Sequence, residues 1–66
     1  MQPLVSAVIL THNRKQLVMR AIESVLTQTY PNIECIVVDD ASMDGTKELL
    51  SARMDIQYIY IPKEES

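Results

Sequence analysis

An apolar run rich in β-branched residues stops abruptly at two adjacent carboxylates, Asp39 and Asp40, and no other pattern constrains the fold as strongly. The run covers residues 33–38, and small or turn-forming residues follow the carboxylates at 41–46. In open parallel α/β sheets, ligands bind in the crevice beyond the carboxyl ends of the strands. The pattern therefore predicts an α/β sheet that presents acidic groups to a ligand.

A second apolar run, residues 4–10, leads into the polar residues 11–14 and predicts another strand of this kind. Apolar residues then recur at helical spacing over residues 14–28. Asn13 and Gln16 fit the capping-box pattern at the start of this helix. The sequence thus predicts a strand, a turn and a helix before the acidic strand begins.

The remaining residues predict a shorter helix and a third strand. The helix is expected over residues 43–54, with Ser42 or Asp44 as its cap and Met54 on its apolar side. Residues 56–61 are rich in strand-forming side chains and end at a proline. The whole chain therefore has the predicted order strand, helix, strand, helix, strand.

Short connections in this order imply a parallel three-stranded sheet, and right-handed crossovers place both helices on the same face of it. Strands 4–10 and 33–38 are apolar enough to be covered on both faces, yet the chain supplies helices for only one. We expect an α/β unit that is incomplete as a domain. Its bare face is expected to associate with another part of the protein or with a second copy.

Composition and motifs exclude several functions. A net charge of −3 with six scattered basic residues argues against a nucleic-acid surface. The single glycine excludes the dinucleotide-binding and P-loop fingerprints. Cysteine and histidine each occur once, so neither a zinc cluster nor a Ser-His-Asp or Cys-His arrangement is indicated.

Location is indicated by two further features. Cys35 lies within an apolar strand, where a buried and inert thiol is favoured over a reactive one, and a lone cysteine suits the reducing cytoplasm. No apolar run is long enough to span a membrane, and the start of the chain lacks the pattern of a signal peptide. Any membrane association is expected to come from regions outside this chain.

The polar strand ends admit more than one role. Asp39 and Asp40 offer acceptors for a ligand N–H or hydroxyl, or for a cation such as Mg²⁺ or Mn²⁺, while the alternative is a structural cap or ion pair. His12 is suited to stacking on a base, to proton transfer or to completing a turn. Arg14 is suited to a phosphate or to solvent. Asn13 is expected to cap the helix rather than to bind a ligand.

Three blocks of the sequence resemble the opening of a family 2 glycosyltransferase, in the same order and at the same spacing. They are VSAVILTHNR at 5–14, AIESVLTQTY at 21–30 and IVVDDASMDGT at 36–46, within a resemblance that runs from about Leu4 to Leu50. The resemblance implies a GT-A fold, in which a Rossmann-like nucleotide-binding half precedes an acceptor-binding half. This chain would be the Rossmann-like half.

In that family, this segment holds the nucleotide of the sugar donor, usually a UDP-sugar. The resemblance implies that Thr11 and His12 line the base pocket, that Asp40 accepts a hydrogen bond from the base, and that Asp39 supports the same loop. The full set of expected nucleotide-sugar-binding residues is Thr11, His12, Asn13, Arg14, Asp39, Asp40 and Ser42. The chain departs from the family at His12, where tyrosine is usual, and at Leu10, where proline is common.

The family's metal-binding D-x-D motif and its catalytic base come later in the chain than these blocks. The resemblance therefore implies an inverting transferase whose divalent cation, Mg²⁺ or Mn²⁺, is held by residues outside this chain. No catalytic or metal-ligating residue is expected within it, and the 66-residue chain alone is predicted to be inactive. The donor sugar and the acceptor, whether glycan, lipid or protein, are not determined by these residues.

Two other functional classes compete with this interpretation. A non-catalytic α/β module would associate through its bare sheet face and use the acidic strand ends only as caps. A receiver-like phosphoacceptor domain would also carry an acidic pair after a strand. In receiver domains that pair normally ends the first strand, whereas here it ends the second.

Overall fold

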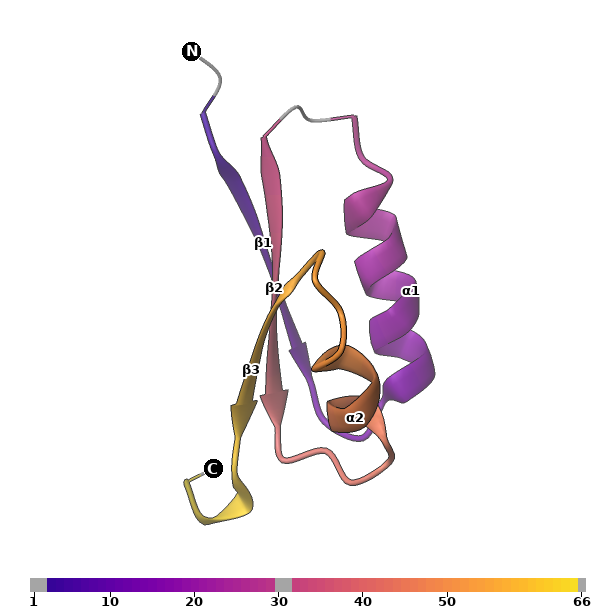
Figure 1. Ribbon diagram of the computed structural model, residues 1–66, viewed down its shortest axis with the longest axis vertical. Helices are drawn as coiled ribbons and strands as arrows, with labels where there is room; N and C mark the ends of the chain where they lie inside the picture. The colour runs from indigo at the N-terminus through magenta and orange to yellow at the C-terminus, as the bar shows by residue number, and fades with distance from the viewer. Residues whose placement is uncertain (1–2, 30–31, 66) are drawn as a thin grey trace.

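The computed structural model describes residues 3–29 and 32–65, and within them strands and helices alternate along the chain. The elements are β1 (Val5–Thr11), α1 (Lys15–Leu26), β2 (Ile33–Asp40), α2 (Thr46–Leu50), β3 (Gln57–Ile61) and a short 3-10 turn, η1 (Lys63–Glu65) (Figure 1). The strands are parallel and lie in the order β1-β2-β3. The predicted fold class, an α/β unit of the Rossmann-like half-domain type with a three-stranded parallel sheet, is confirmed.

The sheet register brings the polar strand ends together. Strand β2 lies in the centre, where it pairs with β1 from Val5 opposite Ile33 to Thr11 opposite Asp39. On its other side, β2 pairs with β3, and Tyr60 lies opposite Asp39. All three strands therefore end at the same edge of the sheet, which is the edge where parallel sheets bind ligands.

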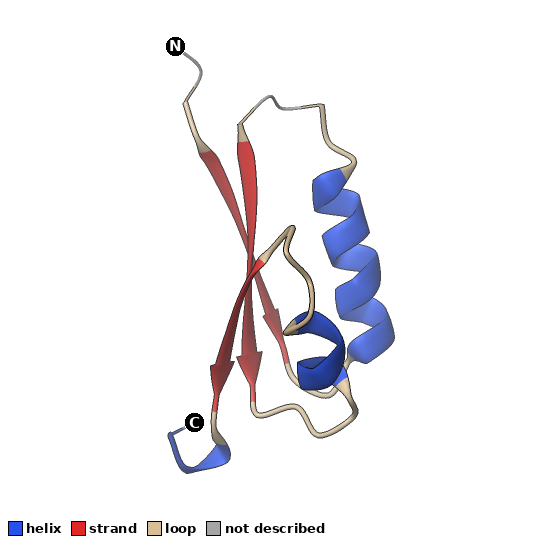
Figure 2. Cartoon of the chain, in the orientation of Figure 1, coloured by secondary structure: helices blue, strands red, loops and turns tan. Residues whose placement is uncertain are grey.

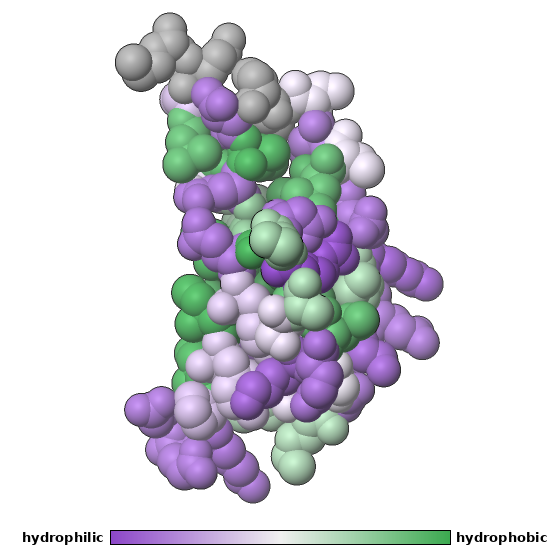
Figure 3. Space-filling model, in the orientation of Figure 1, coloured by the Kyte–Doolittle hydropathy of each residue, from purple (hydrophilic) through white to green (hydrophobic). Residues whose placement is uncertain are grey.

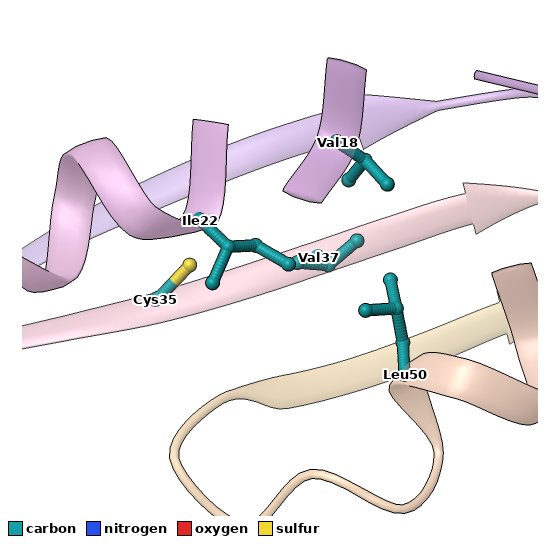
Figure 4. Packing of buried hydrophobic residues seen from close by; sticks show 5 residues of the cluster. All are labelled: Val18, Ile22, Cys35, Val37 and Leu50. Atoms are coloured by element: carbon teal, nitrogen blue, oxygen red, sulfur yellow. The ribbon is translucent and has the colours of Figure 1, made fainter. Parts of the chain in front are cut away.

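Both helices lie on the same side of the sheet (Figure 2). Their apolar side chains meet the inward residues of β2 in a core of five buried residues, Val18, Ile22, Cys35, Val37 and Leu50 (Figure 4). In a strand, alternate residues point to opposite faces, so Cys35 and Val37 share the face that the helices cover. Burial raises the pKa of the Cys35 thiol, which disfavours the reactive thiolate.

The opposite face of the sheet has no helix over it within the described residues. Val8 and Leu10 of β1 are 59% and 78% exposed, and Ile59 of β3 is 49% exposed. The register places Leu10, Val38 and Ile59 in one row across this face. Apolar side chains follow the side of the molecule away from α1 (Figure 3). The predicted bare apolar face is therefore present.

Helix α1 begins and ends inside its predicted range of 14–28, and its expected cap is wrong. Asn13 has a left-handed backbone with φ 51°, Arg14 takes the N-cap position, and no side chain caps the helix from that position. The Asn13 side chain accepts a hydrogen bond from the Met43 backbone N–H instead, at 2.6 Å. At the other end, the Thr27 hydroxyl donates to the Glu23 carbonyl and closes the helix.

Helix α2 has only five residues, Thr46–Leu50, in place of the predicted 43–54. Gly45, inside the predicted range, has a left-handed backbone at φ 91° and takes the N-cap position, so the right-handed helix begins after it. Met54 is 99% exposed, so it supplies no apolar contact that would extend the helix. The residues predicted as the first turn of α2 form a loop at the edge of the sheet.

Candidate functional site

The ends of β1 and β2 form an open cavity of about 450 Å³ at the carboxyl edge of the sheet. It combines apolar side chains from the bare face with polar side chains from the loops that follow the strands. The lining residues are Leu10, Thr11, His12, Arg14, Val38, Asp40, Ile61 and Glu65. Four of the seven residues predicted to bind the nucleotide sugar therefore lie on one cavity, while Asn13, Asp39 and Ser42 lie outside its lining.

The two adjacent aspartates occupy different environments. Asp39 has no exposed surface, and both its oxygens are engaged: Oδ1 accepts the Ser42 backbone N–H at 3.0 Å, and Oδ2 accepts the Tyr58 hydroxyl at 2.5 Å. Asp40 is exposed and lines the cavity, and within the described residues no group bonds to its carboxylate. Asp40 is thus available to a ligand, whereas Asp39 supports the turn that follows it.

Both ring nitrogens of His12 form hydrogen bonds, one to Asp40 at the end of β2 and one to Asn13. Its Nδ1 donates to the backbone carbonyl of Asp40, because a carbonyl can only accept. The neutral ring then carries no proton on Nε2, which accepts the Asn13 side-chain amide at 3.3 Å. With both nitrogens engaged, the ring offers a ligand its flat faces rather than a free nitrogen.

The residue predicted as a helix cap, Asn13, connects the two loops. Its backbone N–H donates to the Ser42 hydroxyl at 2.8 Å, and its side-chain oxygen accepts the Met43 N–H. The left-handed conformation that this geometry requires is tolerated by asparagine better than by most other residues. Asn13 therefore fixes the loop after β1 against the loop after β2.

The carboxylate of Asp44, in the loop after β2, joins the first turns of both helices. Its Oδ2 accepts the backbone N–H of Lys15 at 3.0 Å, and its Oδ1 accepts the hydroxyl and the N–H of Thr46 at 2.5 and 3.2 Å. The Thr46 hydroxyl and then the backbone N–H groups hold the pKa of Asp44 below its ordinary value, against an opposing effect of desolvation. From the sequence, Asp44 was predicted only as a possible cap for α2, and its bond to the start of α1 was not predicted.

The Asp44→Asn variant is expected to be less stable than the wild type at neutral pH, and the deficit is expected to shrink in acid. A carboxyl whose folded pKa is lowered contributes stability that is fully present above its unfolded pKa of about 3.9 and is lost as the pH falls through the folded pKa. Urea unfolding at about pH 7 and at about pH 2 measures this change. The Glu64→Gln variant, altered at an exposed carboxylate, is the control. A deficit that is the same at both pH values would contradict the assignment.

Two other predicted residues, Thr11 and Arg14, line the cavity with polar groups. Thr11 is 6% exposed, and its hydroxyl is buried without a hydrogen-bond partner among the described residues. Arg14 is exposed and lies between the cavity and the start of α1. A planar guanidinium at that position can bind an anionic group of a ligand in the cavity.

Sequence reasoning missed three residues near the site. Ile61 and Glu65 line the cavity from β3 and η1, and Tyr58 reaches Asp39 from β3. The alternation of side chains along residues 57–61 shows which of them share a face of the strand. To tell which of them lie near the site, one also needs the register of β3 against β2. That register is set by tertiary packing and is not readable from a single strand.

No metal centre and no membrane-spanning helix is found in the described part of the chain. Across residues 3–29 and 32–65, no three His, Cys, Asp or Glu side chains are placed to hold a metal ion together. That residues outside this chain hold the divalent cation stays a prediction. Over the same residues, no helix has the length and apolar character needed to cross a membrane.

Comparison with known proteins gives a consistent set of relatives. The sequence model described as "Glycosyl transferase family 2" matches residues 6–66. The chain is 41% identical over 58 residues to UDP-Glc:alpha-D-GlcNAc-diphosphoundecaprenol beta-1,3-glucosyltransferase WfaP of Escherichia coli, covering 88% of this chain and 23% of that protein. It is 48% identical over 59 residues to an uncharacterized glycosyltransferase of Rickettsia prowazekii, covering 88% and 19%.

A third relative, glycosyltransferase GlyG of Streptococcus pneumoniae, is 41% identical over 54 residues, covering 82% of this chain and 18% of that protein. The chain thus spans about a fifth of the length of the curated relatives it matches. The aligned part contains both strand ends and the cavity between them.

Proposed function

Because this chain belongs to glycosyltransferase family 2, we propose that it is the segment that binds the nucleotide-sugar donor of an inverting transferase. The donor is a nucleoside diphosphate sugar, and we assign it to the UDP-sugar class. The acceptor supplies a hydroxyl group. One relative, WfaP, has UDP-Glc in its name, which supports the UDP class for a related cavity.

The main support for the proposal is that the carboxylates of Asp39 and Asp40 differ in their hydrogen bonding. Asp40 presents a free carboxylate to the cavity, which His12 also lines, whereas the carboxylate of Asp39 is fully occupied. Uracil has a single N–H donor and a flat face, which match a carboxylate and an imidazole ring. Arg14 also lines the cavity, which supports the proposal because its guanidinium can bind a charged diphosphate.

The proposal is tested by NMR titration of the complete protein that carries this chain, with UDP as the ligand. Amide shifts are expected to concentrate in residues 11–14 and 39–42. N3-methyl-UDP is the matched control, because it lacks the N–H that the carboxylate of Asp40 would accept and keeps every other group. Equal binding of the two compounds, or shifts that avoid these residues, would contradict the proposal.

The 66-residue chain by itself is expected to transfer no sugar and to hydrolyse no donor. The family's metal-binding motif and catalytic base come later in the sequence than the blocks that this chain resembles, which supports the prediction. We assign the cation, Mg²⁺ or Mn²⁺, and the base to residues outside this chain. Incubation of the purified chain with a radiolabelled UDP-sugar and Mn²⁺ measures both reactions, and detectable product of either would refute this prediction.

The exposed apolar face favours one alternative, a non-catalytic module that associates through this face. Val8, Leu10 and Ile59 would then be buried between copies or against another part of the protein. Concentration-dependent line broadening without any response to UDP would favour that function. The single free cysteine, which is buried, supports a reducing cytoplasmic location for either function, with any membrane association made by other regions.

A further inference from the structure

Tyr58 lies on β3 outside the cavity lining, yet its hydroxyl ends on the buried carboxylate beside the site. The hydroxyl donates to Asp39 Oδ2 at 2.5 Å, and Asp39 has no exposed surface. Burial and then this hydrogen bond raise the pKa of Tyr58, so the hydroxyl keeps its proton and remains a donor. The contact joins the third strand to the turn that follows β2.

From Asp39, hydrogen bonds continue without a break into both loops. The other carboxylate oxygen accepts the Ser42 N–H at 3.0 Å, and the Ser42 hydroxyl accepts the Asn13 N–H at 2.8 Å. The Asn13 side chain then accepts the Met43 N–H at 2.6 Å. The last two bonds join the loop after β1 to the loop after β2, so the two loops hold each other in place.

The same series of bonds ends at the ring that faces the cavity. The Asn13 amide donates to His12 Nε2, and His12 Nδ1 donates to the carbonyl of Asp40. Tyr58 bonds to Asp39, and the last bond of the series ends on Asp40, the next residue in the chain. The orientation of the His12 ring therefore depends on contacts that begin outside the cavity.

We propose that Tyr58 is a positioning residue for the donor cavity, acting through Asp39, Ser42 and Asn13 on the ring of His12. The inference deepens the proposed function and rests on it for its effect on donor binding. Without the hydroxyl, Asp39 Oδ2 has no donor in a place closed to solvent. The carboxylate then turns toward another donor, and its bond to Ser42 weakens.

The Tyr58→Phe variant tests the proposal, and Tyr60→Phe is its matched control. Both tyrosines lie on β3 and point to the same face, but Tyr60 contacts Lys47 on α2 and does not line the cavity. Amide hydrogen exchange of the complete protein, without ligand, is expected to quicken at Asn13, Ser42 and Met43 in Tyr58→Phe alone. Unchanged exchange at these three amides would overturn the proposal.

Donor binding gives the second measurement, at a temperature where every variant is folded. Tyr58→Phe is expected to raise the Kd for UDP and the KM for the donor about fivefold, with kcat within about twofold, because the chemistry of transfer is untouched. Ser42→Ala breaks the same series of bonds further along, so the double variant should be no weaker than the weaker single variant. Effects that multiply, or a wild-type Kd in Tyr58→Phe, would overturn the proposal.

The two measurements separate this inference from the proposed function. If the wild-type protein does not bind UDP, the proposed donor class fails, and the exchange rates still decide whether Tyr58 positions the loops. If UDP binds and Tyr58→Phe behaves as Tyr60→Phe in both measurements, the proposed function stands and the role of Tyr58 is refuted.

Discussion

Replacing Ile22 with alanine is expected to remove a large fraction of the stability of this unit. Ile22 lies on α1 without exposed surface and packs with Cys35 and Val37 of β2 and with Leu50 of α2. Truncating a buried isoleucine to alanine costs about 2–5 kcal/mol, because contacts are lost and a cavity remains. A unit of this size has a free energy of unfolding of roughly 3–10 kcal/mol, so the loss is a large fraction of the total.

Urea unfolding followed by circular dichroism measures the effect of Ile22→Ala. Leu17→Ala is the matched control, because Leu17 lies on the same helix and is 52% exposed. Its cost is expected to stay below about 0.5 kcal/mol. If the two variants unfolded at the same urea concentration, the buried face of α1 would not be the main source of stability.

Replacing Asp40 with alanine is expected to weaken UDP binding by roughly 10- to 100-fold, which is the usual contribution of a hydrogen bond to a charged group. The side chain of Asp40 is exposed on the cavity and bonds to no described residue, so its loss should leave the fold intact. The same deletion at Asp39 would remove the acceptor for Ser42 and Tyr58 and would test stability instead.

Isothermal titration of the complete protein with UDP measures the loss at Asp40. Glu48→Ala, altered at an exposed carboxylate on α2, controls for the change in net charge. The decisive comparison uses N3-methyl-UDP, which the wild type should bind more weakly than UDP. Asp40→Ala should not distinguish the two compounds, and a variant that still prefers UDP would show that another group reads the N–H.

The order of the elements and the exposed sheet face were predictable from the sequence because they follow from local patterns. β-Branched apolar runs specify strands, helical spacing of apolar residues specifies α1, and short connections specify a parallel arrangement. The bare face was predictable because both predicted helices lie on one face of the sheet and leave the other face uncovered. The exposure of Val8, Leu10 and Ile59 agrees with this prediction. The cavity position follows from the ends of the strands.

The loops were less predictable, because their geometry depends on contacts between distant segments. A capping pattern at Asn13 is a local signal, but the side chain is engaged by Met43, thirty residues later. The early start predicted for α2, at residue 43, ignored Gly45, whose left-handed backbone lies inside the predicted range. At Asn13, a tertiary hydrogen bond determines the conformation over local propensity.

The different roles of Asp39 and Asp40 could likewise not be predicted from the pair of residues alone. The resemblance assigned Asp40 to the base and Asp39 to support of the loop, and nothing in the DD pair itself distinguishes them. The pleat of β2 does so, since it turns Asp39 toward the helices, while Asp40 is exposed at the end of the strand. A register shift of one residue would exchange their environments.

The double attachment of Asp44 limits where this unit can change its length. An insertion between residues 41 and 45 would move one carboxylate away from the starts of two helices at once, and both would lose a hydrogen-bond acceptor. The segment between α2 and β3 is also held, because Arg53 bonds to Asp55 and pairs with Glu23 of α1, although Met54 itself is 99% exposed. A tag or an extra loop inserted between residues 41 and 45 would therefore disturb the starts of both helices.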